Sequence, residues 1–96
     1  MNYFFHPEAE EELLSAVYYY HDCQEGLGDD FFYEAQAAIQ RILDFPRAWP
    51  ILEKEVRRCL LNRFPYGILY SIEPDRIFII AVMSLKLNPG YWEYRI

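Results

Sequence analysis

The segment RFPYGILYSIEPDRIFIIAVMS, residues 63–84, decides the fold that this 96-residue chain adopts. Residues 66–72 and 76–84 are rich in β-branched and aromatic types, a composition typical of strands. The intervening stretch Glu73-Pro74-Asp75-Arg76 suits a tight turn with proline at its second position. Residues 55–62 form a further candidate strand upstream. These runs predict a β-meander in the second half of the chain.

The first half begins with a short strand and a helix. Residues 2–5 predict a strand that ends at His6-Pro7, where proline is favourable at the first position of a helix. Apolar residues then recur at helical spacing, so residues 7–24 predict an amphipathic helix. We expect Gly26 and Gly28 to break it.

A second helix follows closely. We expect Asp29 or Asp30 to cap its start and Phe45-Pro46 to end it. Residues 47–50 then form a loop. Because the connection between the two helices is short, they should form an antiparallel hairpin.

The expected fold is therefore α+β: a short N-terminal strand and an antiparallel two-helix hairpin, packed on one face of a small, mainly antiparallel β-sheet. The chain has 96 residues and neither a linker nor an internal repeat. We expect a single domain over residues 1–96.

Composition excludes several classes of protein. A hydrophobic fraction of 53% and an aromatic fraction of 19% are incompatible with a disordered chain. Cys23 and Cys59 form neither a disulfide framework nor a metal-ligand cluster, and His6 and His21 have no partner at ligand spacing. The N-terminus lacks the features of a signal peptide, and no apolar run is long enough to span a membrane. We predict a cytoplasmic protein without a metal or cofactor.

Charge is divided between the two halves. Residues 1–46 carry ten carboxylates and one cation, whereas residues 47–96 carry eight cations and five carboxylates. Such a dipolar pattern can steer a partner of opposite patterning. The net charge of −6 counts against general binding of nucleic acid, which depends on neutralising phosphates.

Arginines are concentrated between residues 57 and 63. Arg57 and Arg58 are adjacent on a predicted strand, so their side chains point to opposite faces of the sheet. We expect one of them to lie on the helix-covered face with a carboxylate partner. Arg63 lies on the Arg57 side if the strand runs unbroken that far. Two arginines on an open face would suit phosphate or carboxylate recognition, and pairing with the acidic helices is the alternative.

Hydroxyl and aromatic side chains supply the other candidates. Ser84 and Lys86 share a parity with Ile80 and Val82, which predicts one common face, but a Ser–Lys nucleophile pair lacks a third orienting group here. At least one of three consecutive tyrosines, residues 18–20, must leave the core-facing side of its helix. The terminal aromatics can stack on nucleobases, grip a partner or fold back onto the sheet; they are Tyr91, Trp92 and Tyr94.

The order of these motifs resembles the RelE/ParE toxin superfamily, also called plasmid-stabilisation proteins. The resemblance covers essentially the whole chain, and the combination is more specific than any single motif. Its elements are the short strand, the acidic helix, the second helix ending in Phe-Pro, Arg63-Phe64-Pro65-Tyr66, Ile68-Leu69-Tyr70, the strand Ile77–Met83 and Pro89-Gly90-Tyr91-Trp92.

This resemblance implies a bacterial toxin encoded beside a small antitoxin, whose disordered C-terminal segment folds onto the toxin in a hetero-oligomer. RelE-like members cleave messenger RNA on the ribosome, whereas ParE-like members inhibit DNA gyrase. The implied partners are therefore the cognate antitoxin and DNA gyrase or, for a RelE-like activity, the ribosome and messenger RNA.

Three positions depart from the pattern of many relatives. Ser84 stands where a histidine is common, and Gly67 stands where arginine is frequent. Many relatives also have two basic residues where this chain has Lys86 and Leu87, so only Lys86 supplies a cation there. Cleavage through a 2′-hydroxyl needs a proton acceptor, a proton donor and cations. Tyr91 is a poor general base near pH 7 unless its environment perturbs it strongly.

We therefore predict a ParE-like toxin that acts by binding proteins and not by catalysis. Candidate residues for target or antitoxin binding are Tyr19, Tyr66, Ser84, Lys86, Tyr91 and Trp92. One alternative is a RelE-like ribosome-dependent endoribonuclease, with the candidate catalytic residues Arg57, Arg58, Arg63, Lys86 and Tyr91. The other is a degenerate, non-toxic member that only binds an antitoxin.

Overall fold

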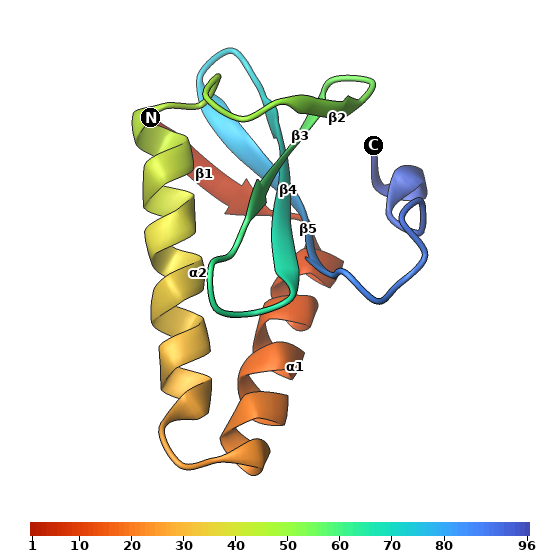
Figure 1. The fold of residues 1–96 in the computed structure, drawn as a ribbon. Helices are drawn as coiled ribbons and strands as arrows, with labels where there is room; N and C mark the ends of the chain where they lie inside the picture. Colours follow the sequence, from red (N-terminus) through yellow and green to blue (C-terminus); the bar gives the residue numbers. More distant parts are fainter.

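Two long helices and a five-stranded sheet make up the protein, whose computed structural model describes residues 1–96 (Figure 1). Strand β1 (Asn2–Phe5) leads into helix α1 (Pro7–Cys23), and α2 (Leu27–Asp44) returns beside it. The remaining strands are β2 (Ile51–Glu53), β3 (Val56–Leu60), β4 (Tyr66–Ile72) and β5 (Arg76–Ser84), followed by the short 3-10 helix η1 (Glu93–Arg95). This order confirms the predicted α+β class and the helical hairpin.

The strand order in the sheet is β1-β5-β4-β3-β2. Strand β1 pairs with β5 in parallel, and every other pairing is antiparallel. The sequence did not reveal β2, because this strand has three exposed residues and shows no alternation. The predicted strand 55–62 was too long: β3 ends at Leu60, and Leu61 instead donates its N–H to the carbonyl oxygen of Tyr66.

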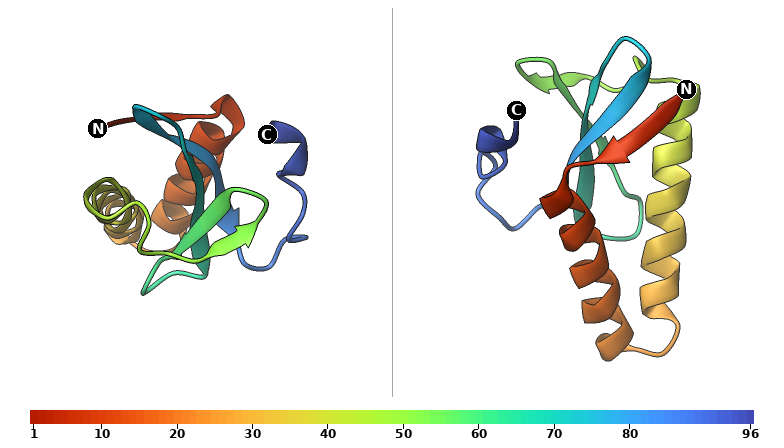
Figure 2. Two further views of the ribbon diagram at one scale, coloured as in Figure 1. Left: turned by 90° about the horizontal axis from the view of Figure 1, so that it is seen from above. Right: turned by 180° about the vertical axis from the view of Figure 1, so that it is seen from behind.

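Helices α1 and α2 cover one face of the sheet, and the C-terminal segment covers part of the other (Figure 2). The larger core lies on the helix side and includes Phe31, Ile39 and Ile68. A smaller cluster on the outer face surrounds Trp92. Neither helix is long and apolar enough to cross a membrane.

A β-bulge in β5 changes the predicted parity of that strand. Leu69 pairs with Ala81 and Tyr70 with Ile79, so Ile80 is an extra residue without a partner on β4. Ile80 and Ala81 both pack on the outer face, whereas Val82 packs on the helix side. The prediction that Ile80 shares a face with Val82 and Ser84 was therefore wrong.

The connection between the helices also differs from the prediction. Gly26, at φ 82°, is the N-cap residue of α2, and Asp29 and Asp30 lie within its first turn. They favour the helix through its dipole and are not its cap. Gly28 is a buried helical residue and not a break, because α1 packs against its backbone. A Cβ atom there would lie 2.6 Å from the backbone oxygen of Val17.

Replacing Gly28 with alanine should lower the free energy of unfolding by about 1–3 kcal/mol, because the added methyl group forces the two helices apart. Alanine normally stabilises a helix relative to glycine, so the sign of the effect reports the packing. Urea unfolding followed by circular dichroism measures it. Gly90→Ala is the control, since the atom that its Cβ would approach most closely is a flexible carboxylate oxygen of Glu93. A more stable Gly28→Ala variant would contradict the close approach.

Candidate functional site

A groove lies between α1 and the adjacent ends of β4 and β5. It consists of two hollows of about 250 and 330 Å³ that share Tyr19, Tyr66 and Ser84 in their walls. One hollow extends to Cys23, Leu27, Pro65 and Lys86, and the other to Glu12, Ser15, Val82 and Leu87. Four of the six predicted binding residues, Tyr19, Tyr66, Ser84 and Lys86, therefore lie around one groove.

The strand pairing explains why residues distant in sequence meet here. Tyr66, the first residue of β4, lies opposite Ser84, the last residue of β5. Leu85 donates its N–H to the carbonyl oxygen of Pro65 at 2.9 Å, which fixes the start of the turn that carries Lys86. Tyr19 reaches the groove from α1, whereas neighbouring Tyr18 does not line it. Helical geometry separates these adjacent tyrosines around the helix.

An aromatic cluster supports the floor of the groove. Phe31 of α2 lies 5.3 Å from the ring of Tyr20, 5.0 Å from Phe64 and 4.9 Å from Tyr66, measured between ring centroids. Burial raises the pKa of Tyr20 and of Tyr66 above that of an ordinary tyrosine. Both phenols are therefore neutral near pH 7 and serve as apolar rings with a hydroxyl group available for hydrogen bonding.

Helix α2 also fixes the loop that carries Pro65. The carboxylate of Glu34 accepts hydrogen bonds from the backbone N–H groups of Asn62 and Arg63, the latter at 3.1 Å. The side chain of Arg63 makes an exposed ion pair with Asp30 at 3.4 Å. The wall of the groove thus rests on two acidic residues of α2.

The predicted cationic residues do not converge. Arg57 donates to the carbonyl oxygens of Arg47 and Trp49, at 3.3 and 2.6 Å. The prediction that the arginine on the helix-covered face pairs with a carboxylate was therefore wrong. Arg58 lies on the opposite face beside Leu52 and Gly90, and Arg63 pairs with Asp30. Lys86 is in the groove. Their opposite strand faces and separate loops keep these side chains apart.

The terminal aromatics fold back onto the body of the protein. Trp92 is fully buried on the outer face of the sheet. Tyr91 donates its hydroxyl to Glu12 at 2.6 Å, and burial, followed by this hydrogen bond, raises the pKa of Tyr91. A tyrosine perturbed in this direction is a still weaker general base near neutral pH. Tyr91 and Trp92 therefore do not line the groove, and their binding role stays a prediction.

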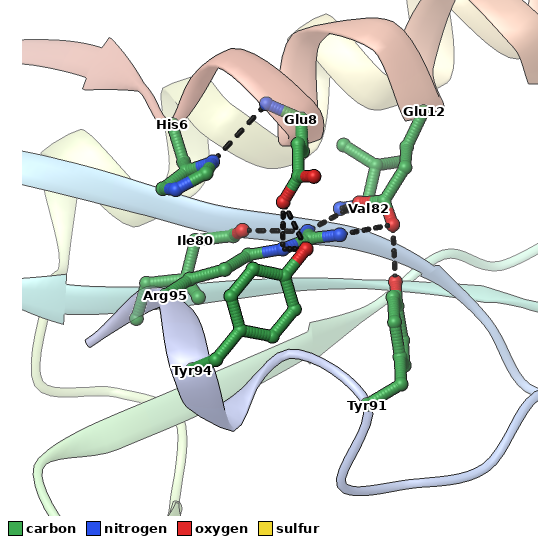
Figure 3. Close-up of polar contacts among 8 residues, drawn as sticks. All are labelled: His6, Glu8, Glu12, Ile80, Val82, Tyr91, Tyr94 and Arg95. Atoms are coloured by element: carbon green, nitrogen blue, oxygen red, sulfur yellow. Dashed lines mark hydrogen bonds and ion pairs between the residues drawn. The ribbon is translucent and has the colours of Figure 1, made fainter.

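Sequence reasoning missed the polar cluster beside the groove, in which Arg95 meets two carboxylates of α1 (Figure 3). The guanidinium donates to both oxygens of Glu12, at 2.9 and 3.0 Å, and its Nε atom lies 3.3 Å from Glu8. Burial alone would lower the pKa of Arg95, but the bonds to Glu12 and Tyr94 outweigh it and raise the pKa. The only sequence signal was the helical spacing of Glu8 and Glu12.

The histidines lie outside the groove. His6 is the N-cap residue of α1, and its Nδ1 atom accepts the N–H of Glu8 at 3.1 Å. His21 lies near the other end of α1, where its Cβ faces Gly28. Neither residue lines either hollow of the groove.

Comparisons with known proteins place this fold among toxins. The family described as the ParE toxin of type II toxin-antitoxin system, parDE, matches residues 3–89. A structure of the chromosomal ParDE toxin–antitoxin system from P. aeruginosa is similar in fold, with a TM-score of 0.63 and 14% sequence identity, over 88% of this chain and 95% of that chain. No curated protein matches.

Proposed function

The chain belongs to the ParE toxin family of type II toxin–antitoxin systems, and from this premise we propose that it inhibits DNA gyrase by direct binding. As a member of this family, the protein is the toxin component of its system, and an antitoxin is its partner. The choice of gyrase as the target follows what is typical of ParE-like toxins.

The dispersal of the candidate catalytic residues carries the proposal. Ribonucleolytic cleavage requires a proton acceptor and cations within reach of one phosphate. Here Arg57 and Arg58 lie on opposite faces of the sheet, and Arg63 is paired with Asp30. The groove offers Lys86 with aromatic rings and hydroxyls, a set that suits recognition of a protein segment.

The same groove is a suitable binding site for the antitoxin. Tyr19 and Tyr66 present rings that can bury apolar side chains, Ser84 offers a hydroxyl, and Lys86 can pair with a carboxylate. An extended segment of the antitoxin laid between α1 and the end of β5 would contact all four residues. Its binding there would neutralise the toxin if the gyrase surface overlaps the groove.

A DNA supercoiling assay with purified gyrase tests the proposed target. Supercoiling should fall as toxin is added and should return when the cognate antitoxin is supplied. Because the proposed mechanism is binding, inhibition should depend on the ratio of toxin to gyrase. A nuclease would instead turn over and cleave an excess of translated messenger RNA.

A reconstituted translation system provides the opposing measurement. Messenger RNA should remain intact at toxin concentrations that stop supercoiling. Folded toxin that leaves gyrase active, while a known gyrase inhibitor works in the same assay, would refute the proposed target. Cleavage of the message that is lost in Arg58→Ala or Arg63→Ala would identify the RelE-like activity instead.

A further inference from the structure

The C-terminal segment from Asn88 to Ile96, here called the strap, has no backbone hydrogen bond to the rest of the protein. The backbone bonds of Tyr91, Glu93, Arg95 and Ile96 all end within the strap. The last backbone bonds before the strap are those of Leu85 to Pro65 and of Leu87 to Ser84, the last residue of β5. The strap is therefore held on the sheet by side chains alone.

Two groups of side-chain contacts hold the strap in place. Trp92 fills the outer apolar cluster against Leu69, Ile80 and Met83. The polar contacts join Tyr91, Tyr94 and Arg95 to Glu8 and Glu12, as Figure 3 shows. A hydrogen bond from Tyr94, the largest influence, lowers the pKa of Glu8. Both carboxylates belong to α1, so the helix fastens the end of the chain.

The fastened strap also closes the edge of β5. Strand β1 ends at Phe5, and the last bond on this edge runs from the N–H of His6 to the carbonyl oxygen of Ile79. Beyond it, Arg95 donates to the carbonyl oxygen of Ile80 at 3.0 Å, and Glu12 accepts the N–H of Val82 at 3.0 Å. One donor and one acceptor from a bidentate pair thus take the place of a neighbouring strand.

The strap is attached less firmly than the burial of Trp92 suggests. Its indole Nε1 atom is buried without a hydrogen-bond partner. Burying an unpaired donor costs free energy and offsets part of the gain from burying the ring. Segments with few backbone bonds to the core are the ones that open locally without global unfolding.

We propose that the strap is a latch that opens as one unit, released by breaking the Glu12–Arg95 pair, while the helix-side core stays folded. When closed, it shields the outer apolar face and the carbonyl oxygen of Ile80 on the edge of β5, and its Arg95 holds Glu12 of α1 against the N–H of Val82. When open, it exposes the outer face and this edge, together with Tyr91 and Trp92. Unpaired strand edges beside apolar surface can pair with another polypeptide segment. The latch therefore controls whether the edge of β5 and the outer face are accessible to such a segment.

Hydrogen exchange of the full-length chain, followed by NMR, tests the latch. In Arg95→Met, the indole N–H of Trp92 should exchange at least about tenfold faster, because the charge-assisted bonds that fasten the strap to Glu12 are lost. The amide of Val82 should also exchange faster, because Arg95 no longer holds its acceptor, Glu12, in place. The amides of Ile39 and Ile68, in the helix-side core, should keep their wild-type rates. Arg76→Met is the matched control, since Arg76 pairs with Glu73 on the exposed surface and should change none of these rates.

A second variant distinguishes the effect of the Glu12 charge from the effect of its size and shape. Glu12→Gln keeps an oxygen for the N–H of Val82 but loses the ion pair, so the same two probes should accelerate by a smaller factor. Equal acceleration of all four probes, or failure of both variants to fold, would show that the strap is part of the main folding unit. Unchanged exchange at Val82 and Trp92 would show that Arg95 does not fasten it. Either result overturns the proposal.

Discussion

Replacing Phe31 with alanine should lower the free energy of unfolding by about 3–5 kcal/mol, because it leaves a large cavity in the core. Phe31 is fully buried and packs between Tyr20, Phe64 and Tyr66, which come from α1, the β3–β4 loop and β4. The ring therefore joins the helical hairpin to the sheet. A loss of this size is a large part of the stability of a 96-residue domain.

Urea unfolding at equilibrium, followed by circular dichroism, measures the effect. Tyr33→Ala is a matched control, because Tyr33 is an aromatic residue of the same helix that is 69% exposed. It should change stability by no more than about 0.5 kcal/mol. If Phe31→Ala proved no more harmful than Tyr33→Ala, the aromatic cluster would not be the junction between the two layers.

Replacing Tyr19 with alanine should weaken binding of the cognate antitoxin by about 30- to 700-fold, the range of an interface hot spot worth about 2–4 kcal/mol. Tyr19 lines both hollows of the groove and is 61% exposed, so its removal takes away contact surface at small cost to the fold. Isothermal titration calorimetry with the purified antitoxin gives the dissociation constant directly.

Tyr18→Ala is the control for the groove. Tyr18 is next to Tyr19 on α1 and similarly exposed, at 66%, but lines neither hollow. The two variants lose the same atoms from the same helix, so a difference in affinity reports position alone. Equal affinities of both variants and the wild-type chain would place the antitoxin elsewhere on the surface.

The architecture could be predicted from the sequence because the patterns that indicate helices and strands lie within short segments. Helical periodicity, the Pro7 start and the Phe45-Pro46 end gave both helices within a few residues, and the strands of residues 66–72 and 76–84 matched β4 and β5. Prediction failed where packing overrides local preference. Gly28 is helical because α1 lies against it, and β2 pairs with β3 without any alternation of its own.

The candidate site, too, could be predicted only in part from local sequence. The sequence predicted Tyr19, Tyr66, Ser84 and Lys86 as binding residues, which carry hydroxyl, aromatic and cationic groups. Their meeting around one groove depended on the register that sets Tyr66 opposite Ser84. The Glu12–Arg95 pair could not be anticipated, because its members are 83 positions apart in the sequence and no local pattern links them.

Sequence alone determined the α+β class, the helical hairpin, the antiparallel meander and the resemblance to ParE-like toxins, since periodicity and turn chemistry are properties of short segments. Tertiary structure alone decided which side of the sheet each residue of β5 faces, through the bulge at Ile80. It also separated the arginines and buried Trp92, a residue of the strap, against the outer face of the sheet. These outcomes depend on contacts between distant segments, which exist only once the sheet has formed.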